Sequence, residues 1–536
     1  MPTRERVPDV PVIIGEPPAW LIAPLSVASY ARPAFPAAGR RLYRRRAREG
    51  WCSLAQTSEG QTIKVPEAQN RSGLDAYFKI SERGSTVRTE LFAGLTTFLT
   101  MAYILFLNPA ILGSVADNTG LKLAFPEVLT VTALAAGVMT IAMGVYGKYP
   151  FAIAAGLGLN AFVTFTLVAQ LGLTWPQAMG VIVIEGVVIS ILVLTGLRQM
   201  IMDAIPLDLK LAIGIGIGLF LSIIGFVNGG VVQRTTTASP VPPLQISPDL
   251  TTLRVLVFLL TLAVTAALIA RKTRGAILIG IAFGTIAAMI INIGWGDKHI
   301  WDAVGPGIAQ FPSSVTASPD FNLVGNFNFG VFSVLSFWTA IAAIVSVMLS
   351  DFFDTMGTAV GLGKEAGLLD QDGRLPGIKR VLFVDGVAAA VGGAVSSSSN
   401  TTYIESGAGI GDGGRTGLTS VVVGVLFLAA MFFSPIAGIV PPEATAPALI
   451  IVGYLMMKSV GDIDWRDAAI GIPAFLTITL MPFTYSISNG IGAGVIAYVV
   501  LKLARGRARE VHPLLYGVAL LFVLYFLRGP LETLIL

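Results

Sequence analysis

The sequence predicts an all-α polytopic membrane protein of about 14 transmembrane segments, arranged as two inverted repeats of about seven segments each. Three observations carry this prediction. Of the 536 residues, 54% are hydrophobic and only 13% are charged, whereas soluble domains carry about 25% charged residues. From residue 91 onward, apolar runs of about 20 residues follow one another, which is the length a helix needs to cross a bilayer. Two runs are interrupted by glycines and polar residues at corresponding places in the two halves.

Residues 1–72 differ in composition from the rest of the chain. They are rich in Pro and Arg, with a basic cluster at 40–48. We expect a disordered N-terminal tail; contact of the basic cluster with anionic lipid is the alternative. The predicted division is a tail at 1–72, a first repeat at 73–293, a connecting loop at 294–330, a second repeat at 331–504 and a C-terminal tail with a short apolar segment at 505–536.

The expected segments follow the hydrophobic runs in order. An amphipathic lead-in helix, Leu74–Arg88, is predicted to lie at the cytoplasmic face. The spans expected in the first repeat are 91–112, 128–146, 149–166, 176–197, 207–227, 253–270 and 276–293. Those expected in the second repeat are 332–360, 381–395, 396–411, 418–436, 446–457, 468–482 and 487–503. The apolar stretch 514–527 is short for a span, so we expect it to lie at the interface or to pack on the bundle.

The third and tenth segments are the two interrupted runs. Residues 156–166 carry two glycines followed by Asn160, and residues 396–411 carry serines, Asn400, Tyr403, Glu405 and alternating glycines. Hydrocarbon cannot satisfy such groups, so irregular polar backbone at this depth is tolerated only inside protein or along a water-filled cavity. Paired broken helices in two halves are typical of the substrate site of a secondary transporter. The sequence therefore predicts a transporter with its site between these two segments.

Loop charge predicts the orientation in the membrane. With the N-terminus inside, the inner loops and tail carry many Lys and Arg residues, such as Arg271, Arg274 and Arg380, whereas the outer loops carry few. Positive charge is enriched on the cytoplasmic side of membrane proteins. We therefore expect a multi-pass protein of the plasma (cell inner) membrane with both termini in the cytoplasm.

Three carboxylates in apolar segments are the main candidates for substrate binding and proton coupling: Asp351, Asp354 and Glu405. A charged group at the bilayer centre costs about 2.5–3.5 kcal/mol or more, so each is a candidate functional residue. Glu405 stands in the interrupted tenth segment, where it can accept hydrogen bonds from a neutral ligand rich in N–H groups. Asp351 and Asp354 are three residues apart and share a helical face. Close carboxylates in a low dielectric hold protons tightly, as proton coupling requires. A solvated helix end is the alternative for this pair.

Three further polar residues have supporting roles in this prediction. Asn160 offers both a donor and an acceptor in the third segment, which makes it a substrate-binding candidate. Asp385 is expected to orient the tenth segment without touching the substrate. Glu185 has apolar neighbours in the sequence, and we expect it to make a structural contact between helices.

At these residues the sequence resembles a known family. The stretches 96–109, 156–162, 351–358, 401–409 and 413–419 look like the adenine/guanine/hypoxanthine branch of the nucleobase–cation symporter-2 family, the AzgA-like purine permeases. The resemblance runs from about Leu74 to the C-terminus and leaves out residues 1–72. One departure is Ala155, where the family often has Pro before the Gly-x-Gly-Leu-Asn run.

The resemblance implies a fold, a substrate and a set of roles. It implies fourteen spans in two inverted repeats, a core domain that moves against a gate domain as an elevator, a homodimer, and proton symport of neutral purine bases. Substrate binding is implied for Asn160, Asp351 and Glu405, and Asp354 resembles the family's companion carboxylate near the proton path. Beyond the resemblance, we expect Ala161, Phe162, Thr402 and Tyr403 to line the substrate pocket, with Phe162 stacking on the base. We expect Asp351, Asp354 and Glu405 to take part in proton coupling, and Asp385 and Ser406 to support the binding residues without touching the substrate.

Alternatives remain within and outside this scaffold. A uracil or xanthine permease of the same fold is the main one, because the acids alone do not separate purine from pyrimidine. Glu405 argues against an anion as substrate. Gly409–Asp412 matches a Gly-x-Gly-Asp signature of intramembrane aspartyl proteases, although Asp412 runs straight into a Gly-Gly-Arg loop.

Other function classes find little support in the composition. One cysteine and two distant histidines disfavour a metal site, and no phosphate-binding loop is present. The net charge of +4 is small and does not suggest nucleic acid as a partner. We expect a transporter that is not an enzyme and needs no cofactor, with a nucleobase, protons and the lipid bilayer as partners.

Overall fold

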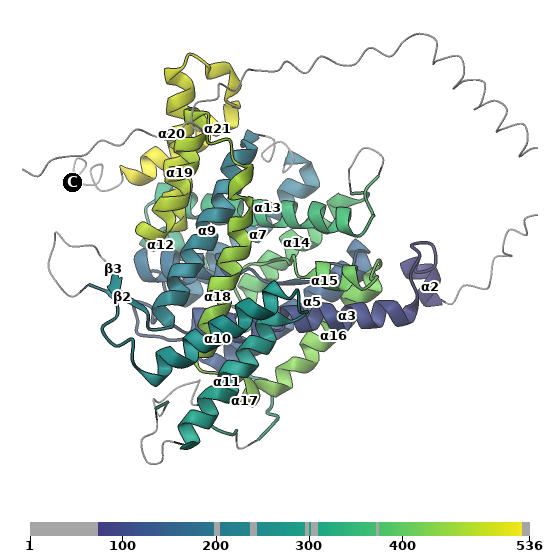
Figure 1. Cartoon of the computed structure of the whole chain (residues 1–536). Coiled ribbons are helices and arrows are strands. Elements are labelled where there is room, and N and C mark those ends of the chain that lie inside the picture. Colours follow the sequence, from purple (N-terminus) through teal and green to yellow (C-terminus); the bar gives the residue numbers. More distant parts are fainter. Residues whose placement is uncertain are drawn as a thin grey trace, which may run out of the picture. The chain divides into compact units, whose positions relative to one another are not determined.

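The computed structural model describes residues 73–197, 204–235, 244–294, 300–301, 309–312, 314–370 and 375–527, and the statements below concern these residues. The expected tail at 1–72 lies outside them. Almost all regular structure is helical (Figure 1). Nine helices of the described chain are long and apolar enough to cross a membrane, and four shorter apolar helices accompany them.

The first half contains the following elements: α2 Gly73–Phe78, α3 Val87–Met101, α4 Ile104–Leu112, α5 Phe125–Ala142 with a π-helical turn η1 Met143–Gly147, strand β1 Ile153–Ala155, α6 Leu157–Ala161 continuing as π-helix η2 Phe162–Gln170, α7 Trp175–Thr195, α9 Leu207–Asn228, strands β2 Val232–Arg234 and β3 Leu244–Ile246, α10 Leu253–Ala270 and α11 Ala276–Gly294.

The second half contains α12 Val331–Val334, α13 Phe337–Glu365, α14 Ile378–Ala394, strand β4 Asn400–Thr402, α15 Ser406–Gly411, α16 Gly417–Ala430, η3 Met431–Phe433, α17 Ser434–Gly438, α18 Pro442–Met457, η4 Lys458–Asp462, α19 Ala468–Phe483, α20 Ile487–Ala504, η5 Ala508–Glu510 and α21 Pro513–Phe526. The predicted spans therefore match helices in order, and the third and tenth are a strand followed by a helix.

The lead-in helix is shorter than the sequence predicted. Helix α2 ends at Phe78 because Lys79 adopts a left-handed conformation (φ 59°), and Asp75 then accepts hydrogen bonds from the backbone N–H and hydroxyl of Ser81. Local side-chain hydrogen bonds of this kind compete with a continuing helix. A new helix, α3, starts where the Thr86 hydroxyl accepts from the backbone N–H of Thr89.

The first span is also broken, which the sequence did not predict. Helix α3 ends at Met101 and α4 begins at Ile104, so Ala102 and Tyr103 lie between two helices in the middle of an apolar run. Pro109 lies inside α4 and has no backbone N–H, so it cannot donate the helical hydrogen bond to the backbone carbonyl of Leu105. The break places the buried Tyr103 ring next to the tenth segment.

The two halves pack in a matching pattern. Helix α7 packs on α14 as α16 packs on α5, α10 pairs with α11 as α19 pairs with α20, and α9 packs against α18. Strands β1 and β4 pair antiparallel, with Ala154 opposite Thr401. An antiparallel pair is related by a local two-fold axis, so this pairing joins the third and tenth segments as inverted equivalents.

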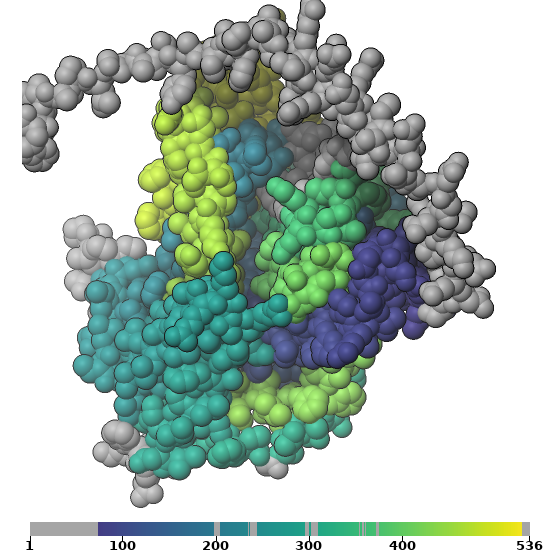
Figure 2. Space-filling model, turned by 45° about the vertical axis from the view of Figure 1, so that its right-hand side comes forward, coloured from purple at the N-terminus to yellow at the C-terminus, as the bar shows by residue number. Residues whose placement is uncertain are grey.

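The helices form two groups. The core group consists of α3–α7, η2 and α13–α16, and the gate group consists of α9–α11 and α18–α20. In Figure 1 the labelled gate helices α9, α10, α11, α18, α19 and α20 gather on one side and α3, α5, α14, α15 and α16 on the other. Figure 2 shows the teal α10–α11 hairpin against purple α3 and the green tenth segment.

Glycines bring the gate helices close together. A side chain at Gly284 would collide with the Thr261 hydroxyl, and one at Gly225 would meet the Ala446 carbonyl, at 2.9 Å. Small residues permit such packing between membrane helices. The short segment α21 runs back along α20, where Phe522 fills the space beside Gly492 and the Tyr525 hydroxyl donates to Asn489. It is therefore packed on the bundle, one of the two arrangements expected for it.

Candidate functional site

The β1–β4 pair forms the floor of the candidate site. Asp385 of α14 is fully buried beneath β4, and its Oδ1 accepts from the backbone N–H of Thr402 at 3.1 Å and from the Thr402 hydroxyl at 3.0 Å. Its Oδ2 accepts from the Thr355 hydroxyl of α13, at 2.7 Å. One carboxylate thus joins α13, α14 and the tenth segment. The predicted role of Asp385, which is to orient the tenth segment, stays a prediction.

Ser406 ties the third segment to the tenth. Its Oγ accepts from the backbone N–H of Ala152 at 2.9 Å and donates to the Tyr403 carbonyl at 2.7 Å. The Tyr403 hydroxyl donates to the carbonyl of Ala155, at 2.5 Å. Both Thr402 and Tyr403 were predicted to line a pocket; the Tyr403 hydroxyl instead joins the tenth segment to β1, and the Thr402 hydroxyl joins β4 to Asp385 of α14.

Glu405 leads into α15 and meets a partner that the sequence analysis missed. The Tyr103 hydroxyl donates to Glu405 Oε1. The Thr100 hydroxyl, at the end of α3, also approaches the Glu405 carbonyl oxygen at 3.4 Å. Tyr103 lies in a hydrophobic run in the sequence, and the break between α3 and α4 is what turns it toward the carboxylate. The available signal was the polar Thr-rich stretch 96–100 before it.

Glu405 also lines a cavity of about 350 Å³ between the two helix groups. The cavity is bounded by Thr100 of α3, the 272–275 turn between α10 and α11, Glu365 at the end of α13, and Leu455 of α18. The Glu405 side chain is half-buried there: part of it faces the cavity, while its Oε1 accepts the hydrogen bond from Tyr103. A ligand between core and gate can reach this side chain.

Asn160 is the second polar group of the site. It lies in α6 with no exposed surface, and neither its amide nitrogen nor its amide oxygen has a hydrogen-bond partner among the described residues. A buried polar group left unsatisfied costs about 1–3 kcal/mol. A conformation that keeps both amide atoms unpaired is suited to a ligand that supplies a donor and an acceptor.

Asp351 and Asp354 differ in their surroundings. Asp351 is fully buried within α13, whereas Asp354, one turn further, is exposed. Asp354 lies within electrostatic range of Asp385 and Glu405. The structure therefore brings Asp354 to the Glu405 side of the site and keeps Asp351 inside the core group.

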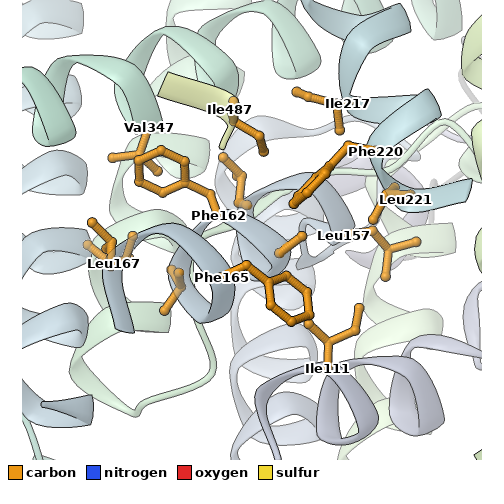
Figure 3. Packing of buried hydrophobic residues seen from close by; sticks show 14 of the residues in the cluster. Ile111, Leu157, Phe162, Phe165, Leu167, Ile217, Phe220, Leu221, Val347 and Ile487 are labelled. Atoms are coloured by element: carbon orange, nitrogen blue, oxygen red, sulfur yellow. The ribbon is translucent and has the colours of Figure 1, made fainter. Parts of the chain in front are cut away.

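Phe162 and Ala161 are completely buried. Figure 3 shows the Phe162 ring near Val347 of α13 and Ile487 of α20, within the apolar cluster that also holds Leu157. These contacts place Phe162 where the third segment meets both the eighth segment and the gate. Its predicted stacking on a base stays a prediction.

Glu185 and the serine run shape the turn that leads into β4. The Ser399 hydroxyl donates to Glu185 Oε2 across 3.2 Å, which is a contact between helix α7 and the tenth segment. Ser396 and Ser398 adopt positive φ angles, 63° and 76°. The serines are buried in this turn.

Asp412 makes contacts that differ from those of a protease acid. Its carboxylate forms an ion pair with Arg274 and accepts from the Thr96 hydroxyl at 2.7 Å. Among the described residues, no three His, Cys, Asp or Glu side chains are grouped to hold a metal ion.

Known proteins share most of the length of this sequence. The sequence profile of the Permease family matches residues 88–492, the stretch that contains the broken segments and all candidate residues. The chain belongs to this family. It is 40% identical over 454 residues to the adenine permease AdeP of Escherichia coli, a match that covers 84% of this chain and 95% of AdeP.

A second relative is the guanine/hypoxanthine permease PbuG of Bacillus subtilis, 38% identical over 457 residues, which covers 85% of this chain and 99% of PbuG. The resemblance to nucleobase–cation symporters predicted from the motifs is confirmed at the level of the family.

Solved structures share the fold. The transmembrane domain of the cyanobacterial bicarbonate transporter BicA aligns with a TM-score of 0.52 at 15% identity, covering 76% of this chain and 97% of that domain. The murine Solute Carrier 26 family member A9 anion transporter, in its inward-facing state, aligns with a TM-score of 0.54 at 12% identity, covering 85% of this chain and 75% of the other. The predicted fold class, an all-α polytopic membrane protein, is confirmed.

Proposed function

We propose that this permease carries purine nucleobases across the membrane, with adenine, guanine and hypoxanthine as the candidate substrates. The unpaired, fully buried amide of Asn160 is the observation that carries the proposal. A purine edge presents N–H donors and ring-nitrogen acceptors side by side, so it can pair with both amide atoms. The similarity to the adenine permease AdeP and the guanine/hypoxanthine permease PbuG supports the same substrate class.

Glu405 and Asn160 would share the base between them. The Glu405 carboxylate reaches the cavity between core and gate and can accept from a purine N–H, while Tyr103 fixes the other oxygen. Asp351 is proposed as a further acceptor from α13, and Phe162 as a stacking surface. Asp385 and Ser406 hold the strand pair on which these groups depend.

Proton coupling is proposed for Asp351, Asp354 and Glu405. Burial disfavours the charged form of a carboxylate, and nearby like charges disfavour it further. Asp354 has both Asp385 and Glu405 within electrostatic range. A proton taken up on one side would neutralise the group during the passage, and its release on the other side would complete the cycle.

The wider setting of the mechanism is also proposed. The core group, which contains both broken segments, would move against the gate group as an elevator, in a homodimer of the cytoplasmic membrane with both termini inside. The separation of the helices into two groups supports this scheme. So does the excess of Lys and Arg in the loops assigned to the inner face.

Uptake by cells that lack their own purine permeases tests the proposal. Cells expressing this chain should take up labelled adenine, guanine or hypoxanthine, faster at acid pH, and a protonophore should abolish the gradient-driven part. Competition by unlabelled purines, xanthine and uracil identifies the preferred base. Uptake of uracil alone would replace the purine assignment, and uptake indifferent to pH and protonophore would refute the coupling.

A further inference from the structure

Within the described parts of the chain, two polar contacts join the core group to the gate group. The first is the ion pair between Arg274, in the turn between α10 and α11, and Asp412, the residue that follows α15. The second links Gln170, the last residue of η2, to the turn between α19 and α20. Its Nε2 donates to the Thr484 carbonyl at 2.9 Å and to the Tyr485 carbonyl at 2.7 Å.

The two contacts occupy equivalent places in the two repeats. Each joins the far end of a broken segment, the third or the tenth, to the turn of a gate hairpin. The α10–α11 hairpin is the counterpart of α19–α20, because each packs in the same way on its long neighbour, α18 or α9. The internal symmetry thus places one contact in each repeat, although the chemistry differs: an ion pair in one and an amide with two carbonyls in the other.

The contacts lie towards opposite ends of the bundle. Helices α9 and α18 run antiparallel, since Gly218 meets Gly453 while Gly225 meets Ala446. Strands β1 and β4 also pair antiparallel, and each is followed by the helix of its own broken segment, α6–η2 after β1 and α15 after β4. These helices lead away from the strand pair in opposite directions, so Gln170 and Asp412 at their far ends lie on opposite sides of it.

The surroundings of the Arg274 contact connect it to the substrate route. Arg274 lines the same cavity as Glu405. Asp412 is mostly shielded, with 15% of its side chain exposed, and the Thr96 hydroxyl holds its second oxygen. The carboxylate is therefore fixed to the core, and Arg274 reaches it from the gate.

We propose that these contacts are two symmetry-related clasps, which hold the core against the gate in this conformation and must open each time the core moves. The inference rests on the proposed elevator transport. A sliding core separates the ends of the third and tenth segments from hairpins that stay with the gate. The Arg274 side chain is 65% exposed, and an ion pair whose cation is in contact with water stabilises little, which suits a contact that must open in every cycle.

Reversible cross-linking tests the clasps, with Cys52→Ser as the parent because Cys52 is the only cysteine. One variant carries Arg274→Cys with Asp412→Cys, and another Gln170→Cys with Thr484→Cys. A bifunctional methanethiosulfonate reagent with a short spacer links each pair, and dithiothreitol releases it. Linkage of either pair should reduce labelled-purine uptake at least tenfold, and reduction should restore it. Linked carriers that transport at the rate of the reduced carriers would overturn the proposal.

The matched control is the ion pair Arg505–Asp467, which lies within the gate group and so should not open during transport. Linking Arg505→Cys to Asp467→Cys should leave uptake unchanged. Uptake by the Cys52→Ser parent reports on the proposed function separately, since a parent that takes up no purine refutes the substrate whatever the clasps do.

A second readout needs no substrate. Ala408 lines the cavity and is replaced by cysteine for this experiment. The measured quantity is the rate at which a membrane-impermeant maleimide alkylates this cysteine in inside-out vesicles. Arg274→Asp should raise the alkylation rate several-fold by opening the clasp, and adding Asp412→Arg should return the rate toward that of the parent. An alkylation rate that Arg274→Asp leaves unchanged would contradict the clasp at this end.

Discussion

The Tyr103 hydroxyl offers a sharp test of the site, because the substitution Tyr103→Phe removes one oxygen and keeps the buried ring. The hydroxyl donates to Glu405 Oε1, and the tyrosine is only 1% exposed, so water cannot replace the lost bond easily. A hydrogen bond to a charged group contributes about 1.5–3 kcal/mol, which corresponds to about 10- to 150-fold in a binding constant. If Tyr103 fixes Glu405 for the substrate, the purine KM should rise within that range.

Initial rates of labelled-purine uptake, normalised to the amount of carrier in the membrane, measure this effect. The expected signature is a raised KM with a smaller change in maximal rate, because the carboxylate remains but is no longer held in place. Tyr516→Phe is the matched control, since its hydroxyl donates to the Ala508 carbonyl at 3.0 Å at an exposed position. A Tyr103→Phe carrier with a KM within twofold of the parent would refute the assigned role.

Three further predictions concern binding and stability. Asn160→Leu should abolish uptake while the thermal stability of the empty carrier, measured in detergent, stays equal or rises, because the change removes an unsatisfied buried amide. Glu90→Gln should lower the free energy of unfolding by about 1–3 kcal/mol, since the buried Glu90 carboxylate accepts from the backbone N–H of Thr419 and from its hydroxyl at the start of α16. Burial raises the pKa of the Asp117 carboxyl, but hydrogen bonds from Thr119 and neighbouring backbone N–H groups outweigh it, so the pKa lies below its usual range. Asp117 therefore stabilises the fold above the unfolded-state pKa and ceases to do so as pH falls through the folded-state value, so Asp117→Asn should be destabilising at pH 7 and lose that effect in acid.

Each of these predictions has a contrary outcome. Uptake retained by Asn160→Leu would remove the amide from the site. A Glu90→Gln carrier as stable as the parent would mean that the neutral amide caps α16 as well as the carboxylate does. A destabilisation by Asp117→Asn that is the same at neutral and acid pH would show that ionisation of this carboxyl is irrelevant to stability.

The sequence predicted the main elements of the fold and marked candidate residues for the site. Long apolar runs are set by bilayer thickness alone, so the bounds of α10 agree with the predicted span at both ends. The polar interruptions marked the third and tenth segments, because groups such as Asn160 and Glu405 are too costly in lipid to occur without a reason. The glycines and serines at 396–411 indicated an interruption of the helix, and in the structure this interruption consists of strand β4 and the turn before it.

Other features depended on contacts between residues far apart in the chain. The break at Tyr103 is invisible in an apolar run, because its hydroxyl is satisfied by a residue 302 positions away. The hydroxyls of Thr402 and Tyr403 looked available to a ligand in the sequence, yet folding commits them to Asp385 and to the Ala155 carbonyl. Asp412 matches a protease signature in the sequence, yet the fold pairs its carboxylate with Arg274.

By itself, the sequence determined that the chain crosses the membrane many times, that its halves are related, and that the third and tenth segments carry the polar groups. The hydrocarbon of the bilayer restricts the polarity of each residue that faces it, so these features can be predicted without knowing which segments are in contact. Only the tertiary structure decided which polar groups are already hydrogen-bonded within the protein and which remain available to a ligand. Hydrogen bonds and ion pairs are directional and short, so a group such as Glu405 acquires its partners only when the two repeats pack together.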